Sequence, residues 1–185
     1  MHKSAMFGVV ALAAFVSTGV AFAQGSSDGQ FHCPVAGTHL ETSLGRHWTA
    51  VREIPPIQCE YRSDKGNFTL TSLITVNPDR YNPNNILEQL WPLQVGKRID
   101  YTTSMGNRSS KQTVEVVSKE AITVKAGHFD VYVIKWTTQS SFRGVHIENV
   151  YYWSPKVATV VKYTFKASLT NEYLPDWEMV KISGP

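Results

Sequence analysis

The feature that most constrains the fold is a series of short β-strand patterns, separated by turn signals, which fills the chain from Asn67 onward. The first pattern alternates Phe68 and Leu70 with threonines. Such alternation of apolar, aromatic and β-branched residues is typical of a half-buried strand. Turn signals such as Gly106-Asn107 separate the later runs. The expected strands are residues 67–75, 98–104, 111–118, 120–125, 129–139, 146–153, 159–170 and 177–182.

The short connections between these runs predict an antiparallel meander of seven to eight strands. One helix is expected at residues 86–91, where Asn85 and Glu88 stand at capping-box positions and Pro92 limits extension. A single short helix excludes a parallel α/β sheet. We therefore expect a mainly β domain, built as one strongly curved antiparallel sheet (an open barrel or sandwich-like) with one short helix.

The first 23 residues have the three-part layout of a secretory signal peptide. Lys3 gives a positive head, residues 5–16 form an unbroken apolar run, and Ala21 and Ala23 place small residues at the cleavage point. The apolar run is too short to span a membrane, which takes about 20 residues. Residues 1–23 are therefore expected to be removed from an exported bacterial protein, periplasmic or secreted, that does not span the membrane.

Residues 24–66 have less pattern than the rest of the mature chain. The Gly- and Ser-rich start predicts a mobile arm, and the prolines within 31–62 predict a loop with one or two short strands. The two cysteines of the chain, Cys33 and Cys59, lie here. In an exported protein without a Cys-x-x-Cys motif they predict a disulfide rather than a metal pair or a reactive thiol. This segment and the β domain at 67–185 are expected to form one globular unit.

Several strands carry aromatic side chains in alternation, and one short helix with a loop is a thin cover for an apolar sheet face. The aromatics then form the ordinary core of a barrel or sandwich, line a concave face that binds an acyl chain or another apolar ligand, or dock a partner protein. Because successive residues of a strand face opposite sides, the candidates cannot all line one cavity. The candidate ligand-lining residues are Trp91, Tyr132, Trp136, Tyr152, Trp153, Tyr163 and Phe165.

Sequence motifs for catalysis are absent. The chain has no Gly-x-Ser-x-Gly elbow, phosphate-binding loop or zinc motif, and its carboxylates are scattered singly. A metal-dependent hydrolase would need His32, His39 and His47 to converge, although their spacing matches no known metal pattern. A net charge of +3 without a Lys/Arg cluster does not indicate nucleic-acid binding. We therefore expect a non-enzymatic protein with no cofactor, metal or nucleic-acid partner, which binds a lipid or apolar small molecule or, alternatively, an envelope protein.

Three stretches together resemble a known group of proteins: residues 91–97 (Trp-Pro-Leu-Gln-Val-Gly-Lys), 124–133 around an Ala-Gly-His-Phe hairpin, and 151–163 with its Tyr-Tyr-Trp-Ser-Pro motif. Their order is similar to that in the TapB-like and related exported bacterial envelope proteins, whose β-rich folds are compared with the half-barrels of LolA and LolB. Ala158 stands near where that group tends to have Gly. The resemblance implies a curved β fold and an exported location, and it implies lipid or lipoprotein carriage only by analogy of fold.

Overall fold

The computed structural model describes residues 28–71, 82–106, 108–141, 144–168 and 174–184. The expected signal peptide at 1–23, the end of the first expected strand at 72–75 and residues 169–170 lie outside them. The described chain forms ten strands and one short helix. The elements are β1 (His39–Thr42), β2 (His47–Ile54), β3 (Gln58–Ser63), β4 (Gly66–Thr71), η1 (Pro83–Leu90), β5 (Arg98–Met105), β6 (Arg108–Val124), β7 (Gly127–Ser140), β8 (His146–Ser154), β9 (Thr159–Ser168) and β10 (Trp177–Ser183).

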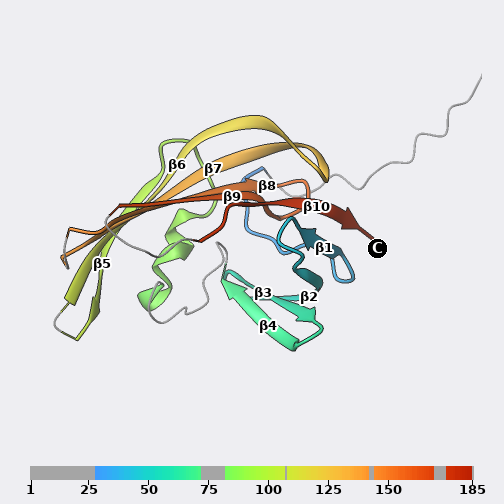
Figure 1. The fold of residues 1–185 in the computed structure, drawn as a ribbon, viewed down its shortest axis with the longest axis horizontal. Helices are drawn as coiled ribbons and strands as arrows, with labels where there is room; N and C mark the ends of the chain where they lie inside the picture. Colours follow the sequence, from blue (N-terminus) through green and yellow to red (C-terminus); the bar gives the residue numbers. More distant parts are fainter. Residues whose placement is uncertain (1–27, 72–81, 107, 142–143, 169–173, 185) are drawn as a thin grey trace, which may run out of the picture.

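The ten strands form one antiparallel sheet in the order β4-β3-β2-β1-β10-β9-β8-β7-β6-β5. The two ends of this order are not paired with each other in the described residues, so the sheet is open. Figure 1 shows it arching over η1, with β2, β3 and β4 on the far side of the hollow. The expected mainly β fold with an antiparallel sheet and one short helix is confirmed, whereas the expected count of seven to eight strands is wrong.

Three of the ten strands, β1, β2 and β3, lie in the segment that the sequence predicted to be loop with one or two short strands. The prediction is wrong because prolines were taken to exclude strands there. Pro55 and Pro56 instead occupy the turn between β2 and β3, where a missing backbone N–H is tolerated.

Strand β6 joins two strands that were expected to be separate, at 111–118 and 120–125. Its register with β7 shifts between Val116 and Ser118, which is a β-bulge. A bulge inserts an extra residue without ending the strand, and it reverses the faces of all later side chains. The broken alternation around Val117 therefore marks a bulge rather than a turn.

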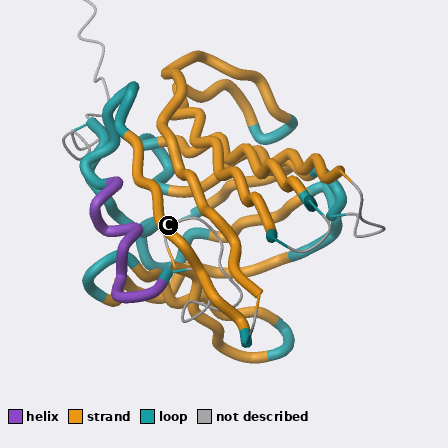
Figure 2. The backbone as a smooth tube through the Cα atoms, turned by 90° about the vertical axis from the view of Figure 1, so that its left-hand side faces the viewer, coloured by secondary structure: helices purple, strands orange, loops and turns teal. Residues whose placement is uncertain are grey.

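The curvature brings strands that are distant in the sheet order into contact through their side chains. Tyr61 of β3 and Leu70 of β4 border the same small gap, about 20 Å³, as Trp153 of β8 and Val160 of β9. Figure 2 shows the strands wrapping round in this way, with η1 at one side. The core thus lies between the two halves of one sheet.

Helix η1 is a 3₁₀ helix that packs into the hollow of the sheet. Leu87 and Leu90 are both fully buried in the core. Asn84 and Asn85 have positive φ angles of 53° and 55°, a conformation that Asn tolerates better than most residues. The expected cap at Asn85 is replaced by Asn82, whose side-chain oxygen accepts a hydrogen bond of 2.8 Å from the amide of Leu87. Within the described residues, no helix has the length and apolarity needed to cross a membrane.

The N-terminal segment is fixed to the sheet at two points. Cys33 and Cys59 form the expected disulfide, which ties the segment to β3. Before it, Asp28 forms an ion pair with Lys119 of β6. The carbonyl of Gly29 accepts a hydrogen bond of 2.7 Å from the amide of Leu93. A disulfide is typical of oxidising compartments, so this bond supports the expected export.

Candidate functional site

A row of five aromatic rings crosses the concave face of the sheet from β5 to β10. Tyr101 and Trp136 have ring centroids 6.5 Å apart, and Trp136 lies 6.5 Å from Tyr151. Tyr151 lies 5.2 Å from Tyr163, which stacks on Trp177 at 5.9 Å. Such pairs contribute roughly 0.5–1.5 kcal/mol each beyond the area they bury. We call these five side chains the aromatic row.

The strand register explains why these rings share one face. Tyr151 stands opposite Tyr163 across β8 and β9, and Tyr163 stands opposite Trp177 across β9 and β10. Ile134, two residues before Trp136 on β7, stands opposite Tyr151. Directly opposed side chains of an antiparallel pair lie on the same face, so five strands each contribute one ring.

A buried amide holds the centre of this face. Gln112 of β6 is 1% exposed, and its side-chain oxygen accepts hydrogen bonds from the indole of Trp136 (2.8 Å) and the hydroxyl of Thr138 (2.6 Å). Its amide nitrogen donates to the hydroxyl of Thr103 at 3.2 Å. A buried amide with these partners is satisfied, and it fixes the orientation of the Trp136 ring.

Tyr101 and Tyr163 of the row are neutral at physiological pH. Burial, with a smaller contribution from the charge of Asp176, raises the pKa of Tyr163 to about 12. Burial also raises the pKa of Tyr101. The Tyr163 hydroxyl donates a hydrogen bond of 2.8 Å to the side-chain oxygen of Asn149. The row therefore presents an uncharged surface, which suits an apolar ligand and gives no group for acid–base chemistry.

One end of the concave face is less covered than the rest. Trp136 and Tyr163 are buried, whereas Tyr101, Asn149 and Phe165 are partly exposed. Phe165 stands opposite Asn149 across β8 and β9, so it lies on the same face as the row. The register places these partly exposed side chains of β5, β8 and β9 toward the same end of the strands.

A second aromatic cluster closes the other end. Trp91, which follows η1, packs edge-on against Trp153 at 4.9 Å and against Phe31 at 5.2 Å. Tyr132 is buried on the same face, because it stands opposite Trp153 across β7 and β8. Lys119 lies over its ring at 5.3 Å. The N-terminal segment and Trp91 thus cover this end of the hollow.

The structure places six of the seven predicted ligand-lining residues on the concave side. Tyr152 differs, since it alternates with Tyr151 and Trp153 and lies on the outer face beneath the amino group of Lys162. The six on the concave side are Trp91, Tyr132, Trp136, Trp153, Tyr163 and Phe165.

Sequence reasoning missed several members of the site. Tyr101, Tyr151 and Trp177 complete the aromatic row, and Gln112 orients it. Trp177 could have been found from the sequence. A tryptophan at the start of a strand, with polar residues on either side of it, indicates which face of that strand is buried. Gln112 could not have been found, since a polar residue at an inward position is indistinguishable from an exposed one in sequence.

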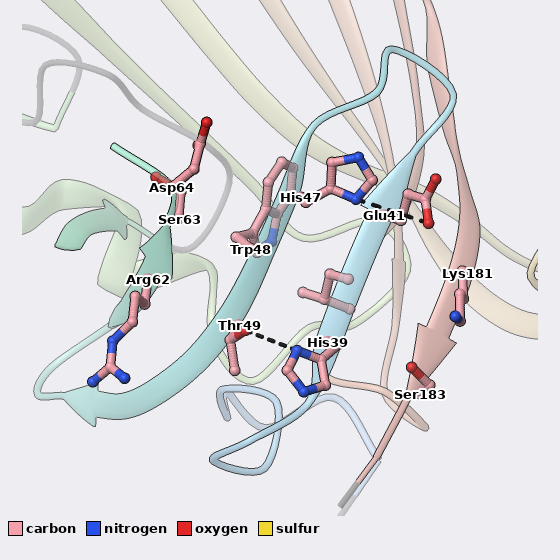
Figure 3. Close-up of a pocket in the computed structure, with 11 residues that line it drawn as sticks. His39, Glu41, His47, Trp48, Thr49, Arg62, Ser63, Asp64, Lys181 and Ser183 are labelled. Carbon is pink, nitrogen blue, oxygen red and sulfur yellow. Dashed lines mark hydrogen bonds and ion pairs between the residues drawn. The ribbon is translucent and has the colours of Figure 1, made fainter. Parts of the chain in front are cut away.

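The outer face of the sheet carries a polar groove of about 440 Å³ across β10, β1, β2 and β3. Leu40 of β1 and Ala50 of β2 point into the core, so the residues that alternate with them point into the groove. Figure 3 shows the side chains that line the groove. Those labelled there are His39, Glu41, His47, Trp48, Thr49, Arg62, Ser63, Asp64, Lys181 and Ser183. Trp48 borders the groove from the core side, because it stands opposite Leu40 and packs on Tyr61 and Phe68.

The histidines considered for a metal site are only partly brought together. His39 and His47 both line the groove, but His32 does not. His39 is hydrogen bonded to Thr49 at 2.9 Å, and His47 lies 3.8 Å from Glu41. In the part of the chain that the structure describes, no three His, Cys, Asp or Glu side chains are placed to hold a metal ion.

Comparisons with known proteins give a structural likeness but no sequence match. No protein-family model and no curated protein matches the sequence. Among solved structures, the fold is similar to that of the hypothetical lipoprotein YmcC from Escherichia coli (K12), with a TM-score of 0.44 and 14% sequence identity. The match covers 83% of this chain and 91% of that chain. A likeness at this level does not bear on function.

Proposed function

We propose that this is an exported bacterial protein that binds a long apolar chain, such as the acyl chain of a lipid, on the concave face of its sheet, without enzymatic activity. The observation that carries the proposal is the aromatic row, an uncharged band of five rings that runs across an open sheet and ends at partly exposed side chains. The proposal agrees with the analogy of fold to LolA and LolB that the resemblance to the TapB-like envelope proteins implies.

The geometry favours entry of the ligand at the end formed by Tyr101 and Phe165. These rings are partly exposed, whereas the other end is covered by Trp91 and the disulfide-tied segment. Because the middle of the row is buried, a bound chain has to displace η1, whose Leu87 and Leu90 fill the hollow. Binding therefore requires a movement of η1 away from the sheet.

The energetics restrict the ligand to long chains. Burying one methylene contributes about 0.8 kcal/mol, so a four-carbon chain gains about 3 kcal/mol. Association costs roughly 4 kcal/mol or more, and displacement of η1 adds to that cost. A sixteen-carbon chain gains up to about 13 kcal/mol, which is enough for micromolar affinity. We therefore expect palmitate to bind and butyrate not to bind.

The test is a titration of the purified mature protein with palmitate, in which binding is measured by the change in tryptophan fluorescence. Phe165→Gln is expected to weaken binding about tenfold, because it removes a partly exposed apolar ring from the entry. Tyr152→Gln is the matched control, since this aromatic lies on the outer face of the neighbouring strand. Equal weakening by both variants, or no binding of any chain length, would overturn the proposal.

Native mass spectrometry of the protein from its host envelope, with extraction of bound lipid, provides an independent check. A reproducible lipid supports the carrier function and identifies the head group. A stoichiometric protein partner without lipid would instead favour the alternative, a protein-interaction module of the envelope.

A further inference from the structure

The polar groove on the outer face is organised as two rows of side chains by the strand register. In the first row, Ser183 of β10 stands opposite His39 of β1, His39 opposite Thr49 of β2, and Thr49 opposite Arg62 of β3. Figure 3 shows these four side chains following one another across four strands. We call them the donor row, because each of the four side chains can donate a hydrogen bond.

Each member of the donor row can donate a hydrogen bond, and none is a carboxylate. The Thr49 hydroxyl is hydrogen bonded to Nδ1 of His39 at 2.9 Å. When Thr49 is the donor, the hydrogen of the neutral imidazole lies on Nε2, where it is available to a ligand. The row then offers the Ser183 hydroxyl, the His39 Nε2–H and the guanidinium of Arg62.

The second row contains the carboxylate of Glu41, which has a lysine and a histidine beside it. Glu41 of β1 stands between Lys181 of β10 and His47 of β2 in the register. Its carboxylate lies 3.8 Å from Nδ1 of His47. Asp64, at the turn after β3, is the other carboxylate of the groove.

The two cations of the groove have no direct ionic partner among the described residues. No hydrogen bond or ion pair joins Arg62 or Lys181 to a residue that the structure describes, although Lys181 stands opposite Glu41 and the charge of Arg62 helps to lower the pKa of Glu60. By contrast, the nearby Arg52 is bound to Glu60 at 2.6 Å, and Lys125 lies 4.0 Å from Glu178. Two cations without a direct ion pair, beside the hydroxyl groups of Thr49 and Ser183, complement an anionic group.

We propose that this groove is a second binding site, separate from the concave face, for a small polar molecule that carries a carboxylate or phosphate group. The anionic oxygens lie along the donor row, where Arg62 supplies a paired hydrogen-bond donor and His39 and Ser183 supply single ones. Glu41 and Asp64 accept hydrogen bonds from hydroxyl groups elsewhere on the molecule. The volume of about 440 Å³ is within the range of small-molecule sites.

The test uses three probes of similar size with the purified mature protein: glucuronate, glycerol 3-phosphate and uncharged glucose. Binding is followed by NMR shifts of the Arg62 Nε–H and the His39 ring at matched ionic strength. Both anions are expected to shift these signals, whereas glucose is expected to leave them unchanged. A response to glucuronate alone assigns the site to carboxylates, and a response to glycerol 3-phosphate alone assigns it to phosphates.

Two variants locate the binding within the groove. Arg62→Gln is expected to weaken anion binding at least about tenfold, because it removes the charged, paired hydrogen-bond donor for the anionic oxygens. His39→Gln is expected to weaken it less. Arg52→Gln is the control, an exposed arginine of β2 outside the groove. The proposal would be overturned if neither anion shifted the signals, or if glucose shifted them as much as the anions do. It would also be overturned if Arg52→Gln weakened anion binding as much as Arg62→Gln.

Discussion

The indole nitrogen of Trp136 donates a hydrogen bond of 2.8 Å to the side-chain oxygen of Gln112, which is 1% exposed and surrounded by the aromatic row. The two residues lie on adjacent strands, β6 and β7, and the same oxygen also accepts from Thr138. A single glutamine thus satisfies two donors on a mainly aromatic face.

Gln112→Leu is therefore expected to destabilise the protein by about 1–3 kcal/mol, although leucine has a similar volume. The cost arises because the buried indole of Trp136 and the partly buried hydroxyl of Thr138 lose their acceptor. The measurement is chemical denaturation followed by tryptophan fluorescence. Gln139→Leu, on exposed Gln139 of β7, serves as the control and is expected to change stability by less than about 0.5 kcal/mol. A Gln112→Leu protein as stable as the parent would show that these hydrogen bonds contribute nothing net.

Loss of the disulfide is expected to lower the free energy of unfolding by about 3.5 kcal/mol. Cys33 and Cys59 are separated by 26 positions, and closing a loop of this length restricts the unfolded chain by that amount in the chain-entropy model. The measurement compares denaturation of the parent with and without reductant. A Cys33→Ala, Cys59→Ala double variant should have the same free energy of unfolding as the reduced parent, with or without reductant. If reductant also destabilised this variant, the effect of reductant would have a cause other than the disulfide.

Asp100 on β5 is expected to titrate at an unusually low pH. The main cause is a hydrogen bond from Arg98, and a second hydrogen bond, from Thr113, adds to it. Together they lower the pKa of Asp100 from 3.8 to about 2. Because the folded-state pKa is below the unfolded value, the contribution to stability is fully present above about pH 4 and is lost as the pH falls toward 2. Carboxyl NMR titration measures this directly.

Arg98→Gln should raise the pKa of Asp100 toward its ordinary value. Arg52→Gln should leave it unchanged, since Arg52 binds Glu60 on β3. An Asp100 pKa near 4 in the parent would contradict the hydrogen-bonded geometry.

Ala158→Gly is expected to stabilise the protein by about 0.5 kcal/mol. Ala158 has a φ of 51° in the turn between β8 and β9, where a side chain costs roughly 1–2 kcal/mol and glycine costs nothing sterically. The greater flexibility of unfolded glycine offsets roughly 0.5–1 kcal/mol of that gain. Thermal denaturation detects the difference. Ala121→Gly, at exposed Ala121 within β6, should instead destabilise, and stabilisation by both variants would exclude the backbone explanation.

Strand β4 and the strands from β5 to β10 were predictable because each is rich in β-branched and aromatic residues and lies between turn signals, although β6 was expected as two strands. The strands β1 and β3 are short, and their partners are set by long-range pairing that no local pattern records. The bulge in β6 was read as a turn because both interrupt alternation.

The candidate sites were predictable to different degrees for related reasons. Trp136 and Tyr163 were found as large aromatics in clear strands, whereas the choice between Tyr152 and Trp153 depended on which face curls inward. That choice is made by the contact of Trp153 with Trp91, far away in sequence. The donor row was not predictable, since it exists only once β10 pairs with β1.

This pairing of β1 with β10 also determines when the sheet can be completed during protein synthesis. Ser43 and Glu178 lie 135 positions apart and are joined by two hydrogen bonds, of 2.8 and 3.1 Å. Strands β1–β4 and β5–β9 each pair with their sequence neighbours, so both groups can form early and locally. The ribosome makes residues 177–183 only after all of these strands. One late seven-residue segment therefore converts two separate small sheets into a single continuous one.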